Sequence, residues 1–137
     1  MLANILVGLS ALIITLLGSA HLVFTFSGPK LLPRYPALTS QMKRVSPRIS
    51  DQTTMWRAWI GFNASHSMGA ILFGLVFGYL ALVHPTLLFG STFLSVVGFL
   101  MLTGLLALAR RYWFSTPFRG IAIALGCYIA GQVIARL

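Results

Sequence analysis

Four polar side chains occur within five positions of the strongly apolar stretch "RAWIGFNASHSMG", at Asn63, Ser65, His66 and Ser67. Residues three and four apart lie on the same side of a helix, so Asn63, His66 and Ser67 are predicted to share one face, with Trp59 one turn earlier. Imidazole, carboxamide and hydroxyl groups can bind a polar ligand, hold a metal or haem, or bond one another. This face is therefore the first candidate site.

A second histidine, His21, lies in the first apolar stretch of the chain, with Thr25 one turn further along. His21 is roughly 9 Å from Ser27, where that stretch ends, and His66 is roughly 13 Å from Arg57, at 1.5 Å rise per residue. If the two stretches are antiparallel helices, both imidazoles reach a similar depth. Three interpretations stay open: polar groups that fix helix register, a binding or catalytic pocket, or a metal or haem site.

The composition predicts that these stretches lie in a membrane. Hydrophobic residues make up 58% of the 137 residues and charged residues 8%, whereas soluble domains have about 25% charged residues. Ten Lys and Arg oppose one acid, Asp51. The cations gather in two segments between apolar stretches, which is typical of cytoplasmic loops and does not favour nucleic-acid binding. The chain is predicted to be an integral membrane protein in contact with lipids. The lack of a targeting signal favours a bacterial inner membrane over an organelle.

We expect an all-α fold, a single domain over 1–137 formed by a bundle of four transmembrane helices. About 20 apolar residues cross a hydrocarbon core about 30 Å thick. The predicted spans cover about 2–27, 57–83, 86–110 and 118–136. Prolines break any long helix in the loop 28–56, and Asp51 is the expected N-cap of the second span. Small residues predict close helix packing along three stripes: Gly61, Ser65 and Gly69; Ala70, Gly74 and Gly78; and Ala122, Gly126 and Ala130.

The positive charges also predict an orientation. The long first loop carries Lys30, Arg34, Lys43, Arg44 and Arg48, and the third loop region carries Arg110, Arg111 and Arg119. The positive-inside rule then places both termini outside the cytoplasm. The histidines would lie in the cytoplasmic half of the bundle, below a rim of arginines. Elsewhere, we expect His84 to be a loop residue at the opposite surface and Gln132 to be a lone packing contact.

A rim of Arg57, Arg110, Arg111 and Arg119 would suit an anionic cofactor, because guanidinium pairs bidentately with carboxylate, and a lipophilic substrate could enter from the membrane. The four short spans, the long basic first loop, "RAWIGFN" at the start of span two and "TPFRG" before span four resemble the membrane-associated eicosanoid and glutathione metabolism family (MAPEG). This resemblance implies a homotrimer with glutathione between subunits near the cytoplasmic side. Arg57 and Asn63 match family positions, whereas His66 and Phe62 replace the family's glutamate and second arginine.

The resemblance also implies roles for individual residues. Arg119 occupies the place of the family's arginine at the start of span four and would stabilise the glutathione thiolate, and Tyr112 could contact the thiol or the substrate. The predicted binding residues are His21, Thr25, Arg57, Trp59, Asn63, His66, Ser67, Arg110 and Arg111. Two alternatives remain. The chain could be a non-enzymatic accessory or scaffold subunit of a larger membrane complex, or a b-type haem protein with His21 and His66 as axial ligands.

Overall fold

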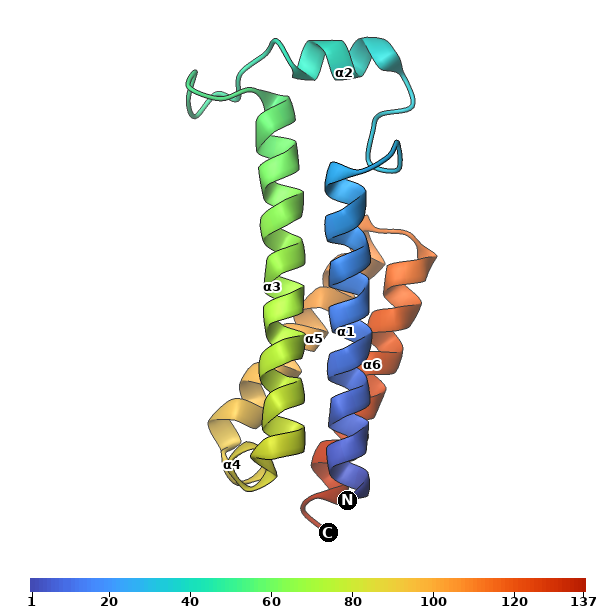
Figure 1. Cartoon of the computed structure of the whole chain (residues 1–137), viewed down its shortest axis with the longest axis vertical. Coiled ribbons are helices and arrows are strands. Elements are labelled where there is room, and N and C mark those ends of the chain that lie inside the picture. Colours follow the sequence, from blue (N-terminus) through green and yellow to red (C-terminus); the bar gives the residue numbers. More distant parts are fainter. The chain divides into compact units, whose positions relative to one another are not determined.

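The computed structural model describes all residues from 1 to 137 and contains helices but no strands. The helices are α1 (Leu2–Phe26), α2 (Pro36–Met42), α3 (Met55–Val83), α4 (Pro85–Gly90), α5 (Thr92–Tyr112) and α6 (Ser115–Ile134) (Figure 1). Four of them, α1, α3, α5 and α6, are long and apolar enough to cross a membrane. The prediction of an all-α protein with four helices long and apolar enough to span a membrane is confirmed.

The helix ends follow from local chemistry. Gly28 has φ +79° just after α1, a backbone conformation that favours glycine. Proline occupies the start of both short helices, α2 and α4, where its missing N–H costs nothing. The start of α3 differs from the expected cap at Asp51. The helix begins at Met55, and the Thr54 hydroxyl accepts a hydrogen bond from the backbone N–H of Arg57 at 3.3 Å. Asp51 is not the cap because it lies four residues before the first helical residue.

The chain divides into two compact units. Unit 1 contains residues 1–17 and 70–137, and unit 2 contains residues 18–69. In unit 1, segments of all four long helices pack around a shared apolar core. Its largest fully buried apolar side chains are those of Tyr128, Ile14, Leu88, Leu102 and Val7. The first turn of α1 packs against the last turns of α6, where a Cβ built on Gly131 would lie 2.9 Å from the backbone oxygen of Ala3.

Glycines allow the helices of unit 1 to approach closely. A Cβ built on Gly74 of α3 would lie 2.7 Å from the backbone oxygen of Ala11 in α1, and one built on Gly131 of α6 would lie 2.7 Å from Val7 Cγ2. The stripe of Ala70, Gly74 and Gly78 thus packs within the chain, as expected. The predicted α6 stripe does not, because α6 instead buries Ile121, Ala124, Tyr128 and Gly131, and Gly126 has nothing within 4 Å of its Cβ position.

Gln132 is not the lone packing contact that the sequence predicted. Its Oε1 accepts hydrogen bonds from Ser95 Oγ of α5 at 2.9 Å and from an Arg136 guanidinium nitrogen at 3.0 Å. A second Arg136 nitrogen donates to Ser95 Oγ at 3.0 Å. The Tyr128 hydroxyl donates to the backbone oxygen of Ser95 at 3.0 Å. These bonds join the end of α6 to the start of α5, because a polar side chain between helices must find partners there.

Replacing Ser95 with alanine is expected to lower the free energy of unfolding by about 1–3 kcal/mol, because Gln132 and Arg136 lose their shared partner. Ser10 provides a matched control, since its hydroxyl is also buried but has no hydrogen-bond partner. Ser10→Ala is therefore expected to be neutral or mildly stabilising. Unfolding of both variants in detergent, followed by circular dichroism, checks the pair. Equal losses in the two variants would show that the network does not stabilise the fold.

Candidate functional site

The polar cluster of unit 2 consists of His21 on α1 and of Asn63 and His66 on α3. His21 Nε2 lies 3.0 Å from Asn63 Oδ1. The His21 and His66 rings meet edge to face, with centroids 5.6 Å apart and planes at 88°. Asn63 is 8% exposed, and both imidazoles are half-buried. The structure thus brings together three side chains that the sequence placed at a common depth on two helices.

The direction of the His21–Asn63 bond follows from the other contact of the amide. Asn63 Nδ2 donates to the backbone oxygen of Trp59 at 2.8 Å, one turn earlier in α3. This leaves Oδ1 as the acceptor facing His21, so His21 Nε2 carries the proton and donates it.

The neighbouring hydroxyl groups support the helices around the cluster. Thr25 Oγ1 donates to the backbone oxygen of His21 at 2.8 Å, and Ser67 Oγ donates to the backbone oxygen of Asn63 at 2.8 Å. Both residues are buried. Since each hydroxyl proton is used on its own helix, Thr25 and Ser67 can offer a ligand only an oxygen lone pair. Thr25 and Ser67 each lie one helical turn from a residue of the polar cluster, and their hydroxyl protons are already used.

A cavity of about 270 Å³ lies one helical turn from the cluster, on the side of the long loop. Thr25 contributes to its wall from α1, and Trp56 and Ile60 contribute from α3. Thr25 is one turn beyond His21, and Ile60 is one turn before Asn63. The remaining walls come from the end of α1 and from the loop, namely Phe24, Phe26, Gly28, Leu31 and Leu32. The cavity is therefore mostly apolar, with the polar cluster next to it.

The other predicted residues of unit 2 lie nearer the loop. The Trp59 indole N–H donates to the backbone oxygen of Leu31 at 3.3 Å and so ties α3 to the loop. Trp59 also borders a second cavity of about 390 Å³, formed with Lys30, Leu31, Leu32, Pro33 and Met42. Arg57 is exposed on the first turn of α3. Neither residue belongs to the polar cluster itself.

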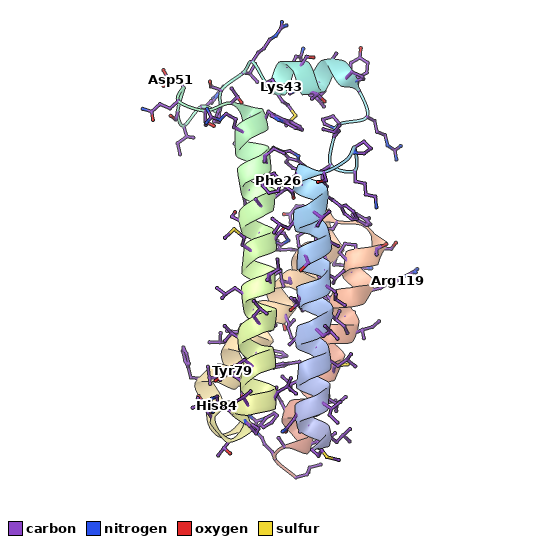
Figure 2. All side chains as sticks on the ribbon, in the orientation of Figure 1. Phe26, Lys43, Asp51, Tyr79, His84 and Arg119 are labelled. Carbon is purple, nitrogen blue, oxygen red and sulfur yellow. The ribbon has the colours of Figure 1, made fainter.

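Four predicted residues belong to unit 1. Arg110, Arg111 and Tyr112 form the exposed last turn of α5, and Arg119 is exposed near the start of α6. The Arg110 guanidinium lies 5.8 Å from the centroid of the Phe118 ring. Arg119 projects outward from α6 (Figure 2). The predicted site residues are thus divided between the two units, and the polar cluster of His21, Asn63 and His66 lies entirely within unit 2.

Sequence reasoning missed the loop residues that line the cavities. Leu31 and Leu32 border both cavities, yet in the sequence they are two leucines between prolines, with no periodicity to mark them. It also missed a contact at the other end of α3, where the Tyr79 hydroxyl lies 3.1 Å from His84 Nε2 (Figure 2). His84 does lie between helices, as expected.

No group of three or more His, Cys, Asp or Glu gathers in a way that could hold a metal ion.

Comparison of the chain with known proteins finds no matching protein family, curated protein or solved structure.

Proposed function

We propose that this chain is a multi-pass membrane protein that binds a lipophilic molecule at the polar cluster and the adjoining 270 Å³ cavity. The observation that carries the proposal is the position of the His21–Asn63 hydrogen bond beside an apolar cavity. Small-molecule sites commonly combine apolar walls with a few well-placed polar groups. A lipophilic ligand would fill the cavity, and its polar end would face the imidazoles.

The charge distribution supports an orientation for this site. The segment between α1 and α3 carries five of the ten Lys and Arg residues, and Arg110, Arg111 and Arg119 flank the link between α5 and α6. By the positive-inside rule we place both of these segments in the cytoplasm and both termini on the other side. The proposed site then opens near the cytoplasmic face of the membrane, and a bacterial inner membrane is the proposed location.

In its more specific form, the proposal is a glutathione-dependent transferase similar to the MAPEG family. Arg57, Arg110 and Arg111 would bind the glutathione carboxylates, and Arg119 would lower the cost of forming the thiolate. Tyr112 would contact the thiol or the lipophilic substrate. The exposure of these arginines supports a site completed by other copies of the chain, because exposed cations are free to meet a ligand held between subunits. A homotrimer is the proposed assembly.

Titration calorimetry with glutathione tests the transferase form. Detergent-purified protein is expected to release or absorb heat with an affinity between micromolar and millimolar, and Arg119→Gln is expected to weaken conjugation of a lipophilic electrophile more than it weakens glutathione binding. Ophthalmic acid, which lacks the thiol, serves as the matched control ligand and should bind but not react. Absence of heat with glutathione would remove the transferase form and leave the lipophile-binding proposal standing.

A second candidate function is that of an accessory or scaffold subunit in a larger membrane complex. It is favoured by the open stripe on α3, where Gly61 and Gly69 have nothing within 4 Å of their Cβ positions and Ser65 is exposed. Such small-residue stripes allow a helix of another chain to approach closely. Blue-native electrophoresis of native membranes separates the candidates. A band of three chains supports the transferase form, and co-migration with other proteins supports a scaffold role.

A bis-histidine haem site is the third candidate and has the least geometric support. Neutral imidazoles can hold haem iron from two sides, but His21 Nε2 already donates to Asn63 Oδ1. Iron binding through this nitrogen would break that bond and deprive Asn63 of its partner. We therefore expect the purified protein to be colourless, and an absorption band in the Soret region would revive this candidate.

A further inference from the structure

We propose that the 390 Å³ cavity beside the loop is a binding site for one anionic phospholipid, separate from the polar cluster. Its walls are Leu31, Leu32, Pro33, Met42 and Trp59, with Lys30 as the only charged member. Neither histidine of the polar cluster borders this cavity. An apolar pocket with a single cation fits an amphiphile that has an acyl chain and a negatively charged head.

The position and setting of Lys30 support a phosphate ligand. Its ammonium lies 3.8 Å from the centroid of the Phe24 ring, a neutral partner that holds the cation without cancelling its charge. The only acid of the chain is Asp51, which lies in the loop just before α3 (Figure 2). No acidic residue is close to Lys30 in the sequence. An anionic head group would therefore supply the counter-charge that Lys30 lacks.

The loop directs the choice toward a membrane lipid rather than a soluble anion. The cavity lies beside the end of α1 and the start of α3. At these helix ends the chain would pass from the hydrocarbon core into the region of the lipid head groups. Trp59, which borders the cavity, is of the residue type enriched at that interface. Four more cations, Arg34, Lys43, Arg44 and Arg48, occur in the same loop. Basic segments next to spanning helices attract anionic lipids, and the cavity offers one such lipid a fixed place.

Native mass spectrometry of the full chain in detergent tests the site with phosphatidylglycerol and phosphatidylcholine of identical acyl chains, and with oleate. Phosphatidylglycerol is expected to bind at one site and about fivefold more tightly than phosphatidylcholine, the factor that one nearby cation contributes. Lys30→Gln is expected to reduce phosphatidylglycerol binding to the level of phosphatidylcholine. Arg48→Gln removes the same charge from the same loop but outside the cavity wall, and is expected to change the affinity less than twofold.

Met42→Trp provides a second variant that keeps every charge and fills the cavity, and it is expected to abolish the single tight site. Three results would overturn the proposal. The first is equal loss in Lys30→Gln and Arg48→Gln, which would indicate diffuse attraction by the loop. The second is unchanged phosphatidylglycerol binding in Met42→Trp. The third is saturable binding of oleate without binding of phosphatidylglycerol, which would assign the cavity to a fatty acid. None of these results bears on glutathione or on the polar cluster.

Discussion

Gly74→Ala is expected to lower the free energy of unfolding by about 1–3 kcal/mol, the cost of overpacking a well-packed interface. The added Cβ would lie 2.7 Å from the backbone oxygen of Ala11 and too close to Thr15 Oγ1. The Thr15 hydroxyl is held in place because it donates to the same Ala11 oxygen at 2.9 Å. Neither obstacle can rotate away freely, so α1 and α3 must separate.

Two other glycines of α3 make this prediction a graded series. A Cβ on Gly78 would meet Ala11 Cβ at 3.4 Å, and a Cβ on Gly69 would meet nothing within 4 Å. We expect Gly78→Ala to cost less than Gly74→Ala, and Gly69→Ala to be neutral or to stabilise, since alanine has the higher helix propensity. Thermal and detergent unfolding of the three variants measures the order. A loss in Gly69→Ala as large as that in Gly74→Ala would contradict the packing described for unit 1.

The second large effect is expected at the polar cluster. Asn63→Leu removes the acceptor of the His21 N–H, and His21→Leu removes its donor. Each change is expected to cost about 1–2 kcal/mol, with a coupling energy between them of about 0.6 kcal/mol and at most about 1.7 kcal/mol, the average and the maximum found for hydrogen bonds between helices in membranes. A double-mutant cycle measured by detergent unfolding isolates this coupling.

Ser67→Ala provides the control for the cycle. The Ser67 hydroxyl bonds within its own helix, to the backbone oxygen of Asn63, and so should show a coupling with His21 close to zero. If His21 couples as strongly to Ser67 as to Asn63, the measured energy reflects general loosening of unit 2. If His21 and Asn63 show no coupling, their hydrogen bond does not contribute to the folded state.

The helices could be predicted from the sequence because each apolar stretch is long and bounded by prolines or charges. Met55–Val83, for example, begins and ends close to the predicted 57–83. The α6 packing face could not be predicted, because small or apolar residues occur on every face of that helix. Tyr128 is buried, and Gly126 is not, because Gly98 on α5 leaves room for the tyrosine ring.

The same distinction applies to the candidate site. Spacing on one helix predicts that Asn63 and His66 share a face, and depth predicts that His21 is near them. Spacing cannot give the direction of a hydrogen bond, which here depends on Asn63 Nδ2 donating to the Trp59 backbone oxygen. Nor can it reveal the cavity, whose loop walls are set by the turn at Gly28 and by the bond from Trp59 to Leu31. The roles of Arg119 and Tyr112 stay predictions.

The claim that the polar cluster and its cavity hold a lipophilic molecule is tested most directly by native mass spectrometry of the protein purified from its own membranes. Ile60→Trp fills the cavity and leaves His21, Asn63 and His66 unchanged, and Ile123→Trp makes the same change on the exposed face of α6. We predict a bound small molecule in the wild type and in Ile123→Trp, and its loss in Ile60→Trp. Identical spectra for all three proteins would contradict the account.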